Sequence, residues 1–198
     1  MPVELEQAED PLALFDEWFD AATRSEASDP NAMALATATT DGVPSVRIVL
    51  LKGRDERGFA FFTNGESRKG EELRANQRSA LCFHWKSQQR QVRVEGTVGE
   101  LAAKEVDAYF RQRPRMSQIG AWASQQSRPL KSREELLALA REYEKKFPEE
   151  VPRPPYWTGF VVRPERIEFW QQGDFRLHDR FAFTANGDGT WTKERLFP

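Results

Sequence analysis

The sequence has few of the residues that build metal centres and disulfides. Its single cysteine, Cys82, cannot form an internal disulfide, and only two histidines, His84 and His178, accompany it. Zinc sites take several of their ligands from cysteine and histidine, so we expect no bound metal and a structural role for His84. A lone cysteine is typical of a protein kept in a reducing compartment. These scarcities predict a cytoplasmic protein without a metal.

Long apolar runs and an excess of positive charge are also missing. No apolar run approaches the roughly 18 residues of a membrane span, and the N-terminus, MPVELEQAED, is too polar for a signal peptide. The 29 basic and 31 acidic residues leave a net charge of −2, which argues against a general polyanion binder. Neither a GxGxxG fingerprint nor a Walker loop occurs. We therefore expect no membrane association and no nucleic-acid partner.

The 198 residues fit one domain built mainly of short strands. Asp10 followed by Pro11 predicts the start of a first helix, which extends to Ala22. The residue patterns predict strands over 33–39, 45–52, 59–63, 80–85, 91–101, 157–162, 166–171, 180–184 and 191–196, and further helices over 67–76, 102–111 and 132–147. Because strands and helices do not alternate regularly, we expect a mainly β, α+β fold in which an antiparallel barrel carries its helices outside. Residues 1–198 would form this single domain, with residues 1–9 as a flexible N-terminal tail.

Cations occur at two places in the first half of the chain where an anion could bind. Arg47 and Lys52 are an odd number of residues apart, so a regular strand points them to opposite faces and to different partners, unless a bulge intervenes. They could also be strand-end charges that reach solvent. Arg68 and Lys69 lie in the first turn of a predicted helix, where cations oppose the helix dipole. A phosphate bound there with help from Ser67 would resolve the conflict; a solvated helix start is the alternative.

A second pair of polar segments lies in the middle of the chain. Tyr109 and Arg113 are four residues apart and share a helix face. Together with Ser117 they have the chemistry of a phosphate site, although a surface charge run fits the pattern equally well. The amides and hydroxyls of residues 120–127 could bind the edge of a heterocycle, but their spacing favours a polar loop.

A last group of cations lies near the C-terminus. In an extended segment, Arg176, His178 and Arg180 share one face, while Leu177 and Asp179 share the other. Three cations on one face repel one another unless they meet an anion or an electron-rich ring. The alternative is a solvent-facing edge that deters aggregation.

Taken together, these segments resemble the pyridoxamine (pyridoxine) 5'-phosphate oxidase family. The resemblance is carried by RIVLLK, FFTNGESRKG, RQVRVEG, YFRQRPRMSQIGAWASQQS, IEFWQ and RLHDR, in this order, and extends from about Asp10 to Pro198. It implies an FMN-binding split β-barrel of antiparallel, Greek-key type. It also implies a homodimer with two FMN sites at the subunit interface, each lined by both chains, so the motifs need not converge within one chain.

The resemblance also implies roles for individual residues. Arg47, Arg68 and Lys69 would hold the FMN phosphate side. The flavin site would be completed by Ile48, Val49, Leu50, Leu51, Lys52, Phe62, Thr63, Gln91, Gln126, Ser127, Trp170 and Arg180. The substrate phosphate would be held by Lys52, Tyr109, Arg113 and Ser117, and the pyridine ring would be covered by Arg176, Leu177 and His178. Arg176 and His178 would be the catalytic residues.

The reaction that the resemblance implies is the oxidation of pyridoxamine 5'-phosphate or pyridoxine 5'-phosphate to pyridoxal 5'-phosphate. FMN would take a hydride equivalent, oxygen would reoxidise the flavin with release of hydrogen peroxide, and the amine would also release ammonia. This activity belongs to pyridoxal phosphate biosynthesis and salvage. The chain departs from many members in two respects. The nine residues before Asp10 contain neither the Arg nor the Tyr that closes over the substrate, and Phe62 replaces an aromatic hydroxyl.

Three other functions compete with this interpretation. A flavin oxidase of the same fold could act on another ring, such as a phenazine precursor, although the intact RPRMSQIGA and RLHDR motifs argue against it. A non-catalytic carrier or sensor of flavin or pyridoxal phosphate is consistent with the missing N-terminal Arg and Tyr. An oligonucleotide-binding barrel is disfavoured by the acidic balance and by the lack of a basic aromatic face.

Overall fold

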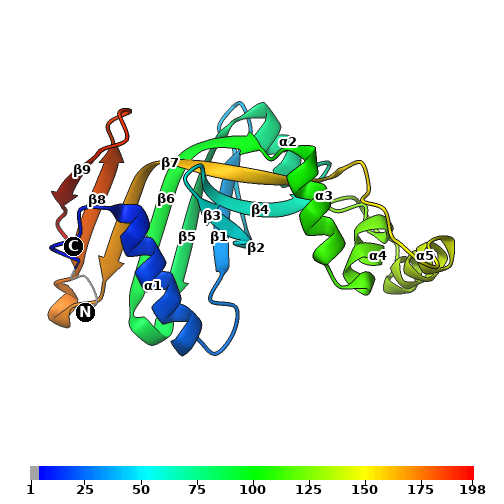
Figure 1. Cartoon of the computed structure of the whole chain (residues 1–198), viewed down its shortest axis with the longest axis horizontal. Coiled ribbons are helices and arrows are strands. Elements are labelled where there is room, and N and C mark those ends of the chain that lie inside the picture. Colours follow the sequence, from blue (N-terminus) through cyan, green and yellow to red (C-terminus); the bar gives the residue numbers. More distant parts are fainter. Residues whose placement is uncertain (1–4) are drawn as a thin grey trace.

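The chain forms one curled antiparallel sheet with helices over its open face and at one end (Figure 1). The computed structural model describes residues 5–198. Within these residues the strands are β1 (Ala32–Ala38), β2 (Pro44–Leu50), β3 (Gly53–Asp55), β4 (Gly58–Asn64), β5 (Arg78–Trp85), β6 (Arg90–Glu100), β7 (Trp157–Gln171), β8 (Asp179–Ala185) and β9 (Trp191–Arg195). They pair in the order β2-β1-β5-β6-β7-β4-β3, and β8 pairs with β7 and β9. The predicted mainly β, antiparallel fold is confirmed.

Five α-helices accompany the sheet in the described part of the chain. They are α1 (Pro11–Ser25), α2 (Arg68–Ala75), α3 (Ala103–Gln112), α4 (Arg115–Ala123) and α5 (Arg133–Lys146), with short 3-10 turns η1 (Lys86–Gln88) and η2 (Asp174–Arg176). None of these helices is long and apolar enough to cross a membrane. The described residues also contain no group of three or more His, Cys, Asp or Glu side chains that could hold a metal ion.

The helix α1 closes the open face of the sheet. Its N-terminus is capped by Asp10, whose Oδ1 accepts a hydrogen bond from the backbone N of Leu12 at 2.8 Å. Its buried face then enters an aromatic core, in which the Phe15 ring meets the edge of Phe59 at a centroid distance of 4.8 Å. Buried aromatic side chains contribute the largest areas to a core, so this contact fixes the helix against the strands. The first predicted helix is therefore confirmed.

Residues 5–9 differ from the flexible tail that the sequence predicts. Leu5 and Ala8 are buried in the main core. The Nζ of Lys193 on β9 donates hydrogen bonds to the carbonyl oxygens of Leu5 at 3.0 Å, Glu6 at 2.7 Å and Ala8 at 2.9 Å. These hydrogen bonds attach the segment to the last strand. They join residues that are far apart in the sequence, so local composition does not predict them. Residues 1–4 of the predicted tail lie outside the described residues.

The strand β7 joins the two ends of the molecule. The sequence analysis predicts two strands, 157–162 and 166–171, on either side of Arg163-Pro164-Glu165. The structure has one strand instead, whose first half pairs with β4 and whose second half pairs with β8. A register shift between Glu95 and Gly96 on the neighbouring β6 accommodates these three residues. A Cβ on Gly96 would lie 1.9 Å from the carbonyl oxygen of Arg163, so only glycine fits there.

The elements β3 and α4 are absent from the prediction, which treats residues 53–58 and 120–127 as loops. The sequence of α4 contains a glycine and little apolar periodicity, but Ile119 is fully buried in a second core at the α3 end of the sheet. Gln118 supports the same packing, since its Nε2 donates to the carbonyl oxygen of Phe110 at 2.9 Å. Tertiary contacts thus stabilise a helix that local helix propensity does not predict.

Candidate active site

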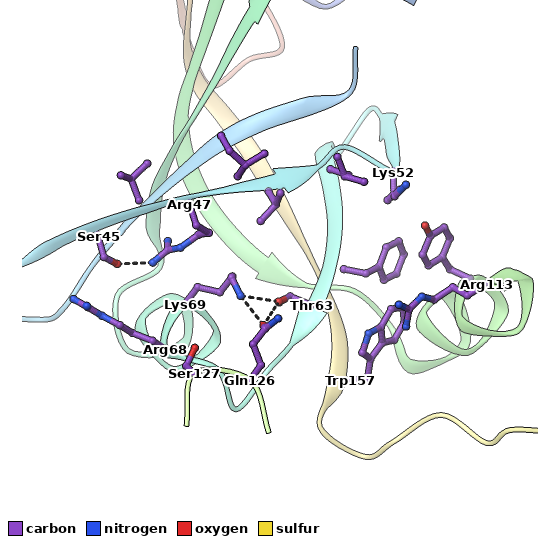
Figure 2. A pocket seen from close by; sticks show the side chains of 16 residues that line it. Ser45, Arg47, Lys52, Thr63, Arg68, Lys69, Arg113, Gln126, Ser127 and Trp157 are labelled. Atoms are coloured by element: carbon purple, nitrogen blue, oxygen red, sulfur yellow. Dashed lines mark hydrogen bonds between the residues drawn. The ribbon is translucent and has the colours of Figure 1, made fainter. Parts of the chain in front are cut away.

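A cavity of about 670 Å³ opens between β2, β4, α2 and α3. Figure 2 shows its lining side chains, with cationic groups at both ends. The lining residues are Ser45, Val46, Arg47, Ile48, Val49, Leu50, Lys52, Phe62, Thr63, Arg68, Lys69, Tyr109, Arg113, Gln126, Ser127 and Trp157. We call the part around Arg47, Arg68 and Lys69 the cationic end, and the part around Tyr109, Arg113 and Trp157 the aromatic end.

At the cationic end, the start of α2 presents a buried lysine to the cavity. The Nζ of Lys69 donates to Gln126 Oε1 at 2.7 Å, to Thr63 Oγ1 at 3.2 Å and to Ser67 Oγ at 3.3 Å. All of these partners are neutral. Burial, together with the positive charge of Arg47, lowers the pKa of Lys69 to about 8. An ammonium group held in this way gains from the arrival of an anion.

The two arginines of the cationic end share one buried carboxylate. Glu72, on the first turns of α2, accepts from Arg68 Nε at 2.8 Å and lies 3.4 Å from Arg47 Nη2. It also accepts from the hydroxyls of Thr37 at 2.5 Å and Ser45 at 2.6 Å. Burial alone would raise the pKa of Glu72, but these hydrogen bonds and the charge of Arg68 outweigh it and lower the pKa to about 2. The carboxylate is therefore ionised and holds both guanidinium groups in place.

At the aromatic end, three rings stack beside a half-buried arginine. Phe62 on β4 stacks on Tyr109 of α3 at a centroid distance of 4.0 Å and on Trp157 of β7 at 5.4 Å. The guanidinium carbon of Arg113 lies 4.9 Å from the Trp157 ring centroid. Its Nη1 is buried without a hydrogen-bond partner, and burial lowers the pKa of Arg113. A half-buried cation that lines a cavity and has an unsatisfied buried donor is suited to an anionic ligand.

Many of the residues that the sequence analysis assigns to a site do line this cavity. They are Arg47, Ile48, Val49, Leu50, Lys52, Phe62, Thr63, Arg68, Lys69, Tyr109, Arg113, Gln126 and Ser127. The premise that one regular strand carries both Arg47 and Lys52 does not hold, because β2 ends at Leu50 and strand alternation therefore does not orient Lys52. Both line the same cavity, Arg47 at the cationic end and Lys52 toward the aromatic end (Figure 2). Leu51 is buried in the core instead.

The other predicted site residues are not among those that line the cavity. Ser117 lies on α4. Gln91, Trp170 and Arg180 lie side by side in the register of β6, β7 and β8. In Figure 1, β8 and the half of β7 that pairs with it, residues 166–171, lie toward the opposite end of the molecule from α3.

The two predicted catalytic residues, Arg176 and His178, lie near Trp170 and Arg180 at the end of the molecule that β8 forms, which we call the β8 end. The His178 ring lies 4.6 Å from that of Trp170, and its Nδ1 accepts a hydrogen bond from the backbone N of Gly173 at 3.2 Å. Arg176 does not continue an extended segment with His178, as the sequence analysis assumes, because it has a φ of 66° in the 3-10 turn η2. Leu177 is exposed beside them.

The sequence analysis does not predict three of the lining residues, which are Ser45, Val46 and Trp157. Ser45 stands two residues before Arg47, so strand alternation places both on one face, and this signal could have found it. Val46 belongs to the other face of β2 by alternation, with Ile48 and Leu50, and it lines the cavity as they do. Trp157 follows a proline-rich segment, and nothing local distinguishes it from a core tryptophan.

The architecture recurs in solved structures. PhzG from Burkholderia lata 383, crystallised with tetrahydrophenazine-1-carboxylic acid, superposes with a TM-score of 0.90 at 33% identity, over 96% of this chain and 94% of that one. A pyridoxamine 5'-phosphate oxidase-related, FMN binding protein from Nostoc punctiforme PCC 73102 superposes with a TM-score of 0.77 at 15% identity, over 96% and 100% of the two chains. The chain is therefore a split-barrel protein, as the sequence analysis expects.

Sequence comparison defines the family. The family model described as Pyridoxamine 5'-phosphate oxidase matches residues 19–171, and the one described as Pyridoxine 5'-phosphate oxidase C-terminal dimerisation region matches residues 157–198. Curated relatives named Pyridoxine/pyridoxamine 5'-phosphate oxidase, from Brucella canis and Brucella suis, are 54% identical over 194 residues, which are 97% of this chain and 96% of each relative. The chain belongs to the pyridoxamine 5'-phosphate oxidase family and is an oxidoreductase. The dimerisation region also supports a homodimer.

Proposed function

We propose that this protein uses FMN and oxygen to oxidise pyridoxamine 5'-phosphate or pyridoxine 5'-phosphate to pyridoxal 5'-phosphate in the cytoplasm. Hydrogen peroxide is the second product, and the amine substrate also yields ammonia. The observation that carries the proposal is one cavity with a separate group of cations at each end. Both the cofactor and the substrate carry a phosphate, so the reaction requires two anion sites that face a common space.

The cationic end fits the phosphate of FMN. Arg47 and Arg68 offer guanidinium donors, and Lys69 is a buried ammonium with only neutral partners. Guanidinium and ammonium groups form short, charge-assisted hydrogen bonds with phosphate oxygens. The neighbouring apolar residues 48–50 of β2, which line the same cavity, would lie against the flavin ring. When bound, the flavin supplies the two-electron redox chemistry that no side chain of the protein provides.

The aromatic end fits the phosphate of the substrate. The unpartnered Nη1 of Arg113 lacks an acceptor that a phosphate oxygen would supply, and the hydroxyl of Tyr109 and the ammonium of Lys52 line the same space. Anchoring the phosphate there fixes the reacting carbon with respect to the flavin, and such positioning makes a large contribution to rate.

A second copy of the chain would complete the site. The β8 end exposes Phe175 by 94%, Leu177 by 71% and Phe197 by 93%, and the edge strand β2 exposes Val46 by 69% and Ile48 by 66%. Apolar surfaces of this kind are usually buried in an interface.

In the proposed homodimer, the β8 end of one copy meets the cavity of the other. Arg176 and His178 then cover the pyridine ring, orient it and assist proton removal, while Gln91, Trp170 and Arg180 complete the flavin site. Ser117, on α4 beyond Arg113, would help to hold the substrate phosphate.

An absorption spectrum of the purified protein tests the proposal. We expect flavin bands that bleach when pyridoxamine 5'-phosphate is added without oxygen, return on admission of air and accompany peroxide formation. Flavin bands that stay unchanged would exclude this substrate and leave a carrier or an oxidase of another ring. A protein that cannot be loaded with FMN would contradict the whole proposal.

Oxidation of a phenazine precursor is the second candidate, because the PhzG structure at 33% identity holds such a ring. The 54% identity to curated pyridoxine/pyridoxamine 5'-phosphate oxidases favours the phosphorylated pyridines. Turnover with pyridoxine 5'-phosphate and with a reduced phenazine carboxylate, measured side by side, separates the two candidates.

A further inference from the structure

Arg113 is held differently from the other arginines of the cavity. Arg47 and Arg68 are both tied to the carboxylate of Glu72. For Arg113, no side-chain hydrogen bond or ion pair is found among the described residues, and its Nη1 is buried and unpaired. Its guanidinium instead lies near two ring faces, 4.9 Å from the centroid of Trp157 and 5.6 Å from that of Phe110.

The ring of Trp157 is itself fixed on several sides. It is 6% exposed, stacks at 4° on Phe62 and meets Phe110 edge-on at a centroid distance of 4.9 Å. The carbonyl oxygen of Trp157 accepts from Arg153 Nη1 at 2.6 Å, which also fixes the start of β7. The platform under Arg113 is therefore rigid before any ligand arrives.

An aromatic platform has one advantage over a carboxylate at this position. A carboxylate would neutralise the guanidinium and occupy its N–H donors, whereas a ring face attracts the cation and leaves those donors free. The cavity then keeps a preorganised cation with unused hydrogen-bonding capacity at its aromatic end.

We infer that Trp157 is a positioning residue for substrate: its ring holds the Arg113 guanidinium toward the cavity so that it can bind the substrate phosphate. The inference rests on the proposed function, because it assigns Arg113 to the phosphate of that substrate. Trp157 acts through Arg113 and takes no part in the redox step. Its loss should therefore weaken substrate binding and leave turnover at saturation and flavin retention nearly unchanged.

The test compares Trp157→Leu with Trp157→Phe in the flavin-loaded protein. From the usual strength of a partly buried cation–π contact, we expect the KM for pyridoxine 5'-phosphate to rise about tenfold in Trp157→Leu, with kcat changed less than about twofold. Trp157→Phe keeps a ring and should recover most of the affinity. Equilibrium dialysis of pyridoxal 5'-phosphate against the same proteins should give the same order of Kd values without turnover. If Trp157→Leu does not fold, Trp157→Met replaces it, since methionine adapts to irregular space.

Two controls separate positioning from general loosening. Trp122→Leu removes a tryptophan that packs on Tyr143 and Phe147 in the same second core and is not among the cavity residues. This variant should leave KM unchanged. In an Arg113→Met background, Trp157→Leu should have no further effect, because the pair acts as one unit.

Three outcomes would overturn the inference: an unchanged KM in folded Trp157→Leu, an equal rise in Trp122→Leu, or a full additional rise in the Arg113→Met background. Failure of the proposed function is recognised separately, since the wild-type protein would then neither bleach with nor turn over pyridoxine 5'-phosphate.

Discussion

The carboxylate of Glu72 holds Arg68 on the same helix, with Arg68 Nε 2.8 Å from Glu72 Oε1. The other oxygen of Glu72 faces Arg47 and two hydroxyls across the sheet. One buried acid thus joins the start of α2 to β1 and β2, and it leaves the cationic end with three cations against one carboxylate. The remaining double positive charge matches a phosphate dianion.

The first prediction concerns this carboxylate. Glu72→Ala should lower the free energy of unfolding of the flavin-free protein by about 2 kcal/mol, because it leaves charged and hydroxyl donors without an acceptor. Urea unfolding measures the change. Glu71→Ala is the matched control, since Glu71 pairs with Arg128 where both side chains are 55% exposed, and its loss should cost less than about 0.5 kcal/mol. Equal losses in the two variants would show that the buried network has no special stability.

The pH dependence of that loss follows from the pKa of Glu72, which is lowered to about 2 from an ordinary value of 4.5. A depressed carboxyl pKa stabilises the folded protein fully above the unfolded value, and the contribution is lost as the pH falls toward the folded value. The stability difference between wild type and Glu72→Ala should therefore be constant near neutral pH and shrink between about pH 4.5 and pH 2. A difference that persists at the acidic end would contradict an ionised Glu72.

The second prediction concerns Lys69, whose pKa is lowered to about 8 in the free site. Phosphate binding favours the charged ammonium, so above pH 8 the protein must take up a proton when FMN binds. The affinity for FMN should therefore be nearly flat between about pH 6.5 and pH 7.5, where the phosphate is a dianion, and fall by up to tenfold per pH unit above pH 8. Fluorescence titration of the flavin-free protein with FMN measures this. Lys69→Arg keeps a permanent charge and should flatten the profile; identical slopes would exclude Lys69 as the titrating group.

The sequence predicts well those features of the fold and of the site that depend on neighbouring residues. Asp10 caps α1 as its position before Pro11 indicates, and the cations Arg68 and Lys69 lie at the start of a helix where an anion could bind. These features depend on neighbours in the sequence, so local patterns reveal them. The family resemblance adds residues 48–50 of β2 and Phe62 and Thr63 of β4 to the lining residues.

The features that the sequence does not predict depend on distant contacts. The continuity of β7 through Pro164 requires the register shift at Gly96 on another strand. The role of Trp157 depends on the placement of Arg113 by α3, about forty residues earlier in the chain. The conformation of Arg176 reflects a positive φ that the RLHDR pattern does not signal. Periodicity carries no information about such tertiary effects.

The third prediction tests the register shift. Gly96→Ala should destabilise the protein by about 3 kcal/mol, because its Cβ would lie 1.9 Å from the carbonyl oxygen of Arg163, and a backbone atom cannot move aside easily. Gly99→Ala, on the same strand, is the control. Its Cβ would meet only the Cγ1 of Val161 at 3.9 Å, so the cost should stay below about 1 kcal/mol. Thermal and urea unfolding of both variants measure the difference, and similar losses would show that the strand relaxes around Gly96.

The fourth prediction tests whether each site draws on two copies. Arg113→Met should bind substrate so much more weakly that it is nearly inactive at a substrate concentration near the wild-type KM, and Arg176→Ala should lose most turnover while it keeps its flavin. Arg113 lines the cavity, whereas Arg176 lies at the β8 end. Within one chain, these two places are far apart (Figure 1). If a cavity is completed by the β8 end of the other copy, a mixed dimer has one doubly altered site and one intact site.

Mixing the two inactive variants under conditions that exchange subunits should therefore restore about a quarter of the wild-type activity, since half of the dimers are mixed and half of their sites are intact. The rise should follow the rate of subunit exchange and be absent when either variant is incubated alone. If both residues served a cavity within one chain, every chain in the mixture would remain defective, and no activity would return. Peroxide formation from pyridoxine 5'-phosphate, recorded during the mixing, distinguishes the two arrangements without assuming which residue acts as a base.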